Sequence, residues 1–335
     1  MQSNSPRNTG IVAVIASLAA AIVIASTSAQ DRTPDPGAWG SDHVNKPLPM
    51  YTTGEECLFC HREKVGNTLS TEAHAQTMRV VQAVSPTLRA LLASEDAASF
   101  AGETTYVLGG SQVRRFLKPN GAYGQFALHA AKWTPGEEGE AGMLTGADGA
   151  WDNDRFAQRC AGCHATAVET EYHAVSAASL DCFVCHGDTP QGHQNKPERA
   201  LFAAKREREP LVEISICAQC HLRGGSSRSS GLPYPNQFVP GDNLFRDFEV
   251  DLSSETIAAM NAGDRHIFEN VRAVLFGGVL DLTCTSCHDI HDQSSRKHRI
   301  LKRLQRDAYC RICHDNLEDY SSLVGYDVHS DLCEY

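Results

Sequence analysis

The chain has 335 residues, with 41 Asp and Glu against 30 Lys and Arg, so its formal net charge is −11. This acidic balance excludes a protein whose whole surface binds nucleic acid or anionic lipid, and it favours partners with basic docking faces. Aromatic residues make up only 7% and glycine contributes 26 residues, so side chains alone offer little material for a large apolar core.

The first 29 residues have the features of a secretory signal peptide. Arg7 precedes an apolar run from Ile11 to Ala25, and small residues up to Ala29 suit a signal peptidase. The run is short for a membrane span, and an uncleaved anchor is the alternative. We therefore expect export to the periplasm or the cell exterior, with no stable membrane insertion of the mature chain.

Residues 30–54 are polar and rich in proline, which predicts an extended N-terminal arm. Residues 68–95 have helical character. Residues 104–133 predict a β-hairpin, because strand-like segments flank Pro119-Asn120-Gly121. Glycine and proline predict loops at 134–150 and 223–243.

Residues 252–276 are expected to form a helix, and a basic helix is expected to follow it. The basic residues suit a solvated face, or alternatively a docking patch, and they are Arg296, Lys297, Arg299, Lys302, Arg303 and Arg306. The expected fold class is mainly α with much irregular loop and a small β-hairpin insertion near 104–133. The expected organisation is a signal peptide at 1–29, an arm at 30–54 and one domain at 55–335.

The dominant feature of the chain is the pattern Cys-x-x-Cys-His, which occurs six times. The copies, numbered motif 1 to motif 6, are Cys57-Leu58-Phe59-Cys60-His61, Cys160-Ala161-Gly162-Cys163-His164, Cys182-Phe183-Val184-Cys185-His186, Cys217-Ala218-Gln219-Cys220-His221, Cys284-Thr285-Ser286-Cys287-His288 and Cys310-Arg311-Ile312-Cys313-His314. Twelve of the 13 cysteines belong to it. The remaining thiol, Cys333, is expected to be free and exposed, with an intermolecular disulfide as the alternative.

This spacing is that of covalent c-type haem attachment. Two thiols three positions apart can reach the two vinyl groups of one haem, and the following histidine supplies the proximal nitrogen to the iron. Zinc knuckles, dithiol redox pairs and disulfides are the alternatives. They give no reason for a histidine after every pair, and 15 histidines in 335 residues make six coincidences untenable. The pattern predicts six covalently bound haems.

Nine histidines remain for the distal side of the six irons. They are His43, His74, His129, His173, His193, His266, His291, His298 and His329. A second imidazole lowers the potential of a haem, whereas methionine, the weaker candidate here, raises it.

The chain resembles the multihaem cytochrome c family that includes the tetrahaem electron acceptors of hydroxylamine oxidation, and related exported multihaem cytochromes. The resemblance covers most of the mature chain and is carried by motifs 1 to 5 with their flanks, such as Glu72-Ala73-His74-Ala75 and Asp289-Ile290-His291. Asp188 and Ile290 depart from residues frequent in the family, and the usual haem number of the family is not six.

The resemblance implies that His74, His193 and His291 are distal ligands, each usually of a haem other than the one that it follows. His266, His329, His173 and His129 are further candidates, followed by His298 and His43. Haem order does not carry over from the family.

Two functions follow from these expectations. The first is electron transfer, because an iron with two imidazoles has no open position; the protein would be a periplasmic carrier or an extracellular wire, with redox proteins as donor and acceptor and possible self-assembly into a filament. The second is an enzyme with one open iron that acts on a small nitrogen or sulfur compound. No catalytic residue is indicated, and a gas sensor would not need six haems.

Overall fold

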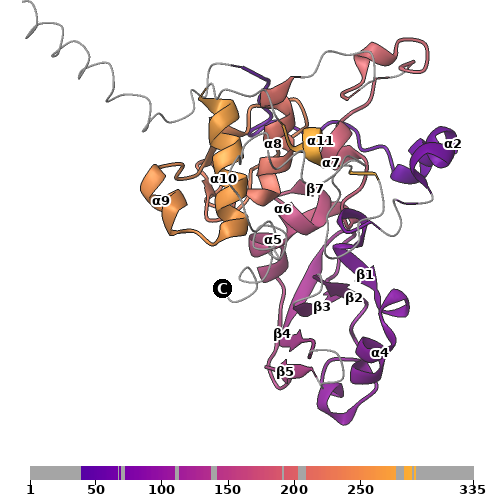
Figure 1. The fold of residues 1–335 in the computed structure, drawn as a ribbon. Helices are drawn as coiled ribbons and strands as arrows, with labels where there is room; N and C mark the ends of the chain where they lie inside the picture. Colours follow the sequence, from indigo (N-terminus) through magenta and orange to yellow (C-terminus); the bar gives the residue numbers. More distant parts are fainter. Residues whose placement is uncertain are drawn as a thin grey trace, which may run out of the picture.

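A computed structural model of the chain describes residues 39–291, except 67, 69–71, 110–112, 137–141, 191, 203–208, 277–282 and 289. Two regions are visible (Figure 1): a sheet lobe, residues 78–152, in the lower half of the view, and a motif region above it. The motif region consists of α2 and residues 155–291. The expected signal peptide, the start of the arm, the basic helix and motif 6 lie outside the described residues.

The sheet lobe is built on one antiparallel sheet of six strands. The strands are β1 (Met78–Val80), β2 (Tyr106–Leu108), β3 (Arg114–Pro119), β4 (Phe126–Thr134), β5 (Met143–Thr145) and β6 (Trp151–Asp152). The strand order is β1-β2-β3-β4-β5, and β6 also pairs with β4. Helix α4 (Pro86–Leu92) lies beside the sheet, flanked by 3-10 turns at Val81–Ala83 and Glu95–Ala97.

The sequence explains this local structure. Burial alternates along the second half of β4, as expected for a strand with one covered face. Helix α4 begins where Ser85 Oγ accepts the N–H of Leu88 at 3.3 Å, with Pro86 in the first turn. Leu88, Phe100 and Phe116 then form the centre of a core made of side chains.

The expected fold class, mainly α, is wrong. The hairpin near 104–133 exists as β3 and β4, but it is part of the six-stranded sheet that β1 and β5 extend. Residues 68–95 contain α4, but the part around Met78 is a 3-10 turn followed by β1 rather than a continuous helix. Short strands such as β1 and β5 have little periodic signal of their own and exist because a neighbouring strand pairs with them.

The motif region is mostly short helices joined by loops. Its helices are α2 (Gly54–His61), α5 (Arg155–Arg159), α6 (Ala161–His164), α7 (Phe183–His186), α8 (Pro210–His221), α9 (Ser254–Ala259), α10 (Ala262–Leu275) and α11 (Cys284–Cys287). Two small sheets pair β7 (Ala165–Glu169) with β8 (Ala174–Ala178), and β9 (Ser226–Ser227) with β10 (Phe248–Glu249). Single helical turns lie at Arg62–Gly66 (π) and at His74–Gln76, Pro197–Arg199 and Leu244–Arg246 (3-10).

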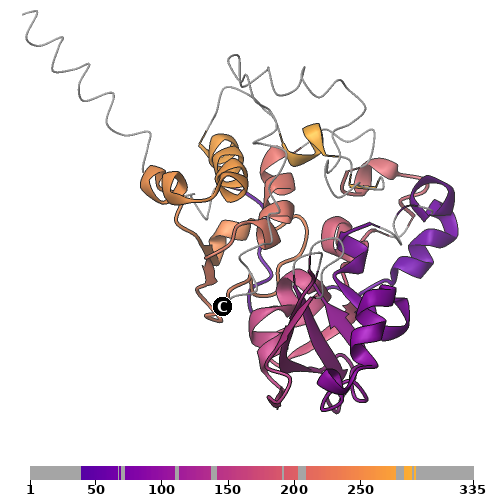
Figure 2. The same ribbon diagram turned by 60° about the horizontal axis from the view of Figure 1, so that its bottom comes forward.

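Helix α8 is the central helix of the motif region (Figure 2). Its residues from Val212 to Ile216 are all buried, and Ile214 packs with Phe268 of α10 in one apolar cluster. The helix expected at 252–276 is divided into α9 and α10, because Asn261 caps α10 by accepting the N–H of Asp264 at 3.0 Å. In the described part of the chain, no helix has both the length and the apolar character to cross a bilayer.

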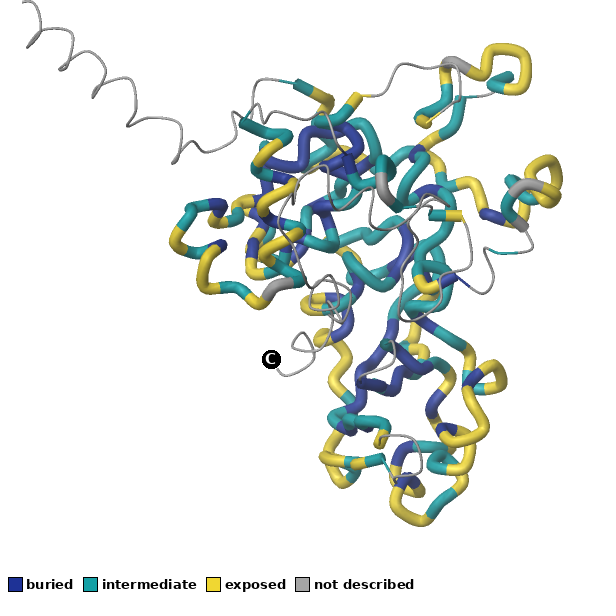
Figure 3. Tube along the Cα trace, in the orientation of Figure 1, coloured by how far each residue is buried: buried dark blue, intermediate teal, exposed yellow. Residues whose placement is uncertain are grey.

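Buried residues run through both regions and meet between them (Figure 3). Leu117 and Leu128 of the sheet share a cluster with Phe156 and with Ala161 of motif 2. On the other side of motif 2, the ring of Tyr234 fills the space next to Gly162, and its hydroxyl donates to the carbonyl of Ala157. Motif 2 is therefore packed on both sides.

His129 of β4 lies inside the sheet lobe with 2% of its surface exposed. Its ring lies 4.6 Å from that of Phe100 and 4.8 Å from that of Trp151, centroid to centroid. Its Nδ1 accepts the N–H of Ala131 at 3.0 Å, so its proton is on Nε2. Burial lowers the pKa of His129.

The packing of motif 2 predicts the effect of a single methyl group. We expect Gly162→Ala to lower the free energy of unfolding by about 1–3 kcal/mol, because the added Cβ would overlap the Tyr234 ring. Urea unfolding followed by circular dichroism measures this loss. The control is Gly102→Ala, where an added Cβ meets no atom within 4 Å; equal effects of the two variants would contradict the prediction.

The burial of His129 predicts an acid-sensitive sheet lobe. Below pH of about 6.5 the unfolded chain binds a proton at His129 that the folded chain excludes, so stability falls as pH falls toward the lowered pKa of the folded state. In His129→Gln this part of the pH dependence disappears. Urea unfolding of both proteins across this pH range tests the prediction, which identical slopes of stability against pH would contradict.

Candidate functional site

Each of motifs 1 to 5 either forms a short helix or lies at the C-terminal end of a longer one. In motifs 1 and 4 the helices α2 and α8 end on the motif histidine, and in motifs 2, 3 and 5 the motif itself forms the four-residue helices α6, α7 and α11. Residues three apart on a helix lie on the same face, so both thiols of a motif point to one side. None of the described cysteines of these motifs forms a disulfide.

Helix α8 of motif 4 contacts three other motifs, each through an interior residue of that motif. Gln219 Nε2 donates to the carbonyl of Val184 in motif 3 at 3.3 Å. Cys220 Sγ donates to the carbonyl of Gly162 in motif 2 at 3.7 Å. Glu213 Oε1 accepts the N–H of Thr285 in motif 5 at 2.7 Å. Motif 4 is therefore the common neighbour of motifs 2, 3 and 5.

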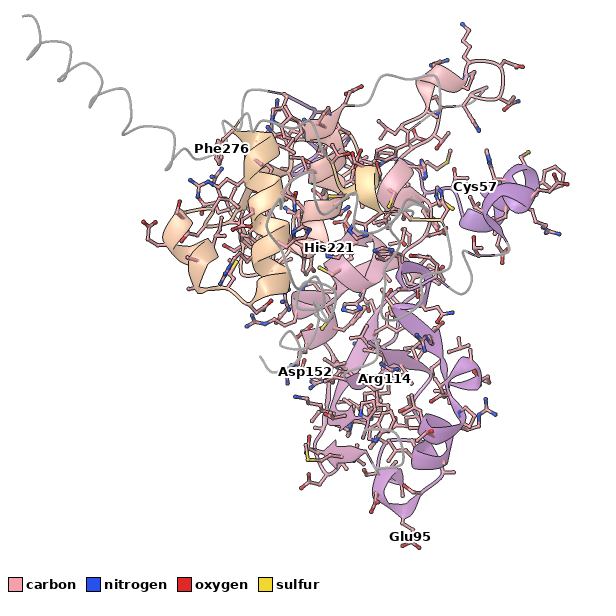
Figure 4. The ribbon with its side chains drawn as sticks, viewed as in Figure 1. Cys57, Glu95, Arg114, Asp152, His221 and Phe276 are labelled. Atoms are coloured by element: carbon pink, nitrogen blue, oxygen red, sulfur yellow. The ribbon has the colours of Figure 1, made fainter. Side chains whose placement is uncertain are left out.

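Asp181 joins motif 1 to motif 3. Its carboxylate accepts the N–H of Gly54, at the start of α2, at 2.8 Å, and the N–H of Cys182 at 2.6 Å. The Tyr51 hydroxyl also donates to it. Together with the contacts of α8, this places motif 3 between motif 1 and motif 4, and motifs 2 and 5 beside motif 4. In Figure 4, Cys57 lies on the outlying α2, whereas His221 lies near the centre of the molecule.

The thiols of different motifs approach each other along these contacts. Cys57 interacts with Cys182, Cys163 with Cys220, and Cys217 with Cys284. Burial, followed by the charge of Asp181, raises the pKa of Cys182 to about 12, and burial raises that of Cys185 to about 11. The two thiols of motif 3 therefore do not suit a dithiol oxidoreductase, whose attacking cysteine needs a lowered pKa.

The zinc alternative finds no support in the same residues. Among the described residues, no three His, Cys, Asp or Glu side chains gather as they would around one metal ion. A structural zinc site needs four such ligands.

Three motif histidines face a histidine that lies outside their own motif. The ring centroids of His61 and His193 are 6.2 Å apart with an interplanar angle of 18°, and those of His186 and His291 are 6.1 Å apart at 7°. The third pair is His74 and His221, at 6.3 Å and 77°. The structure thus brings His74, His193 and His291 each to a motif that they do not directly follow.

The separation of these pairs fits a metal ion between two imidazoles. An imidazole nitrogen lies about 2 Å from a metal that it binds and the ring centroid about 1 Å farther, so two imidazoles on opposite sides have centroids about 6 Å apart. The three pairs agree with this value and differ from each other by 0.2 Å at most. The donor set therefore fits an iron with an imidazole on each side.

Hydrogen bonds at Nδ1 prepare these rings for such a role. His193 Nδ1 lies 3.3 Å from the carbonyl of Pro190, and His186 Nδ1 lies 3.4 Å from that of Leu201. Because a carbonyl only accepts, Nδ1 carries the proton and Nε2 keeps a lone pair for a metal. Burial, and next the neighbouring His291, lower the pKa of His186, which favours the neutral ring that a metal needs.

Glu72 holds the proton of His74 on Nδ1 in the same way. This role of Glu72 was not predicted from the sequence. It is 3% exposed, and its carboxylate holds His74 Nδ1 at 3.0 Å and the backbone N–H of His74 at 3.1 Å. A carboxylate that orients a histidine is a frequent partner of metal-binding imidazoles. Its only sequence signal is its position two residues before a candidate ligand.

Other predicted residues lie elsewhere. His43 Nδ1 lies 2.8 Å from the buried carboxylate of Asp242, His173 Nδ1 lies 3.2 Å from Asp154, and His129 is inside the sheet lobe. His266 is exposed on α10. His164 and His288 are half-buried, at the end of α6 and next to α11. Outside the described residues lie Cys310, Cys313, His314, His298, His329 and Cys333.

Residues 121–187 match the family described as Cytochrome c554 and c-prime. No curated protein sequence matches the chain. A solved structure, described as an undecaheme cytochrome from the S-layer of Carboxydothermus ferrireducens, is similar with a TM-score of 0.44 and 16% sequence identity. The similarity covers 82% of this chain but only 44% of that one, so the chain spans less than half of its length.

The matched segment runs from the β3–β4 connection through motifs 2 and 3 to the residue after His186. The match implies covalently bound haem, and the segment contains the paired thiols and the following histidine of motifs 2 and 3. Over these residues the chain is similar to a family of multihaem c-type cytochromes.

Proposed function

We propose that the chain is an exported hexahaem cytochrome that carries electrons along a series of mostly bis-histidine haems. The observation that carries this proposal is the set of three histidine pairs, which join motif 1 to His193, motif 3 to His291 and motif 4 to His74. In each pair the motif histidine is the proximal ligand and its partner the distal one. Bound haem supplies a one-electron couple of the iron.

Two axial imidazoles make such a site suited to electrons alone. With both axial positions filled by protein nitrogens, no substrate can bind the iron. The hydrogen bonds of Nδ1 to Glu72, Pro190 and Leu201 keep the three rings in place. A fixed coordination requires little rearrangement when the iron changes its oxidation state, which favours electron transfer over catalysis.

The contacts between motifs support a branched route for the electrons. Asp181 keeps motif 1 beside motif 3, and Gln219 keeps motif 3 beside motif 4. From motif 4 the route divides toward motif 2 at Gly162 and toward motif 5 at Thr285. Motif 1, whose Cys60 and His61 are exposed, is the outer end of this route.

The cellular setting is part of the same proposal. Attachment of c-type haem and a signal peptide at 1–29 both point to a location outside the cytoplasm, in the periplasm or beyond the cell. The partners are a redox donor and a redox acceptor with basic faces, since the formal net charge is −11. The proposal includes assembly of copies into a filament, which electron microscopy of the secreted protein would detect.

The proposal predicts six haems, all low-spin when oxidised. Mass spectrometry of the purified protein should show the polypeptide without residues 1–29 plus six haems. Electron paramagnetic resonance of the oxidised protein should show low-spin ferric signals only, because two imidazoles give a strong ligand field.

A different result would favour the enzyme. A high-spin signal that integrates to one haem in six, together with turnover of nitrite or hydroxylamine, would replace the carrier by a multihaem oxidoreductase with one open iron. A mass increase smaller than that of six haems would contradict the proposed number of haems.

The histidine pairs predict the effect of single ligand substitutions. His193→Ala, His74→Ala and His291→Ala should each convert one haem, that of motif 1, 4 or 3, to a high-spin form, because each removes one axial nitrogen. The same resonance measurement counts the converted haems.

The matched control is His173→Ala, whose ring lies beside Asp154 rather than a motif histidine. It should leave every haem low-spin. If the three substitutions left the spectrum unchanged, or if His173→Ala changed it as they do, the proposed pairs would be wrong.

A further inference from the structure

Glu213 is a buried carboxylate in the middle of the motif region. It lies on α8, one turn before the first cysteine of motif 4, with 2% of its surface exposed. Its neighbours along the helix, Val212 and Ile214, are buried as well. A carboxylate costs free energy in such a place unless its charge is compensated or used.

The contacts of Glu213 do not neutralise it. Its Oε1 accepts the backbone N–H of Thr285, a neutral donor, at 2.7 Å. Across the described residues, no Lys, Arg or His side chain forms an ion pair with it. The carboxylate is close enough to Cys217 and Cys284 for its charge to act on both thiols. An ionised Glu213 places one negative charge between motif 4 and motif 5.

We propose that Glu213 lowers the reduction potential of the haems at motifs 4 and 5. This inference rests on the proposed function, since it requires haem at both motifs. A nearby negative charge stabilises ferric iron over ferrous iron, and it acts strongly where water is excluded. Glu213 is a positioning residue that acts through its field and does not touch the iron.

Because Glu213 lies beside motif 4, its charge affects the proposed electron route. Motif 4 is the junction between motifs 2, 3 and 5, so its potential affects each branch. Electrons move toward higher potential, and a low-potential junction passes them outward to motifs 2 and 3. The Thr285 hydrogen bond keeps the second affected haem, that of motif 5, at a fixed place relative to the charge.

The test is a redox titration of the full holoprotein, followed in the haem absorption band, for wild type and Glu213→Gln. Glutamine removes the charge and keeps an oxygen acceptor for Thr285. We expect two of the one-electron steps to move to higher potential, with about a tenfold change in their ratio of oxidised to reduced haem at a fixed applied potential, or about 59 mV. The remaining steps should move less.

Two further variants separate charge from structure. Glu209→Gln removes the same charge from the exposed N-cap residue of α8, one turn before Glu213, where the surrounding water weakens its field, and should change the titration little. Glu213→Asp keeps the charge but shortens the reach to Thr285, and its titration should stay close to that of wild type. A purely structural role predicts the reverse, with Glu213→Asp more disturbed than Glu213→Gln.

Unchanged potentials in Glu213→Gln would overturn the inference, and so would loss of haem from that variant, which would assign Glu213 a structural role. Failure of the proposed function looks different. In that case peptide mapping of the wild type would find no haem at Cys217 and Cys220 or at Cys284 and Cys287, before any variant is compared.

Discussion

The structure depends on contacts between motifs that are distant in sequence. Each described motif contacts another motif through a side chain, and α8 takes part in three of these contacts. The four-residue helices α6, α7 and α11 are far too short to be stable alone. Their conformation follows from these tertiary contacts, and so do the directions of the thiols and imidazoles.

The interiors of the two regions are filled by different kinds of side chain. In the sheet lobe, Phe100, Phe116 and Leu88 fill the core, and a buried histidine serves as one more packed ring. In the motif region, half-buried cysteines and histidines occupy the interior surfaces where the motifs meet. Bound haem would cover these surfaces, which explains why a chain with only 7% aromatic residues can hold together so many short helices.

The motifs were predictable because their chemistry is local: two thiols and an imidazole must be adjacent on one turn to serve one haem. The hairpin at Asn120-Gly121 and the helix α10 were predictable for the same reason, since a turn and a cap carry their own signals. The sheet around them was not, because β1 and β5 acquire their conformation from pairing partners. Glu72 and Asp181 show the same limit, since their roles depend on which motif lies opposite.

Under the proposed ligation, the histidine pairs link cofactor binding to the folding of the whole motif region. His74 lies 147 residues from His221 in sequence, and the pairs of His61 with His193 and of His186 with His291 span similar distances. An iron held between two such residues closes a long loop, which removes much of the freedom of the unfolded chain. Because the three loops overlap along the sequence, no pair can form in isolation from the segments that carry the others. The proposed ligation and the packing around α8 would therefore stabilise each other, and the order of motifs along the chain need not be their order in space.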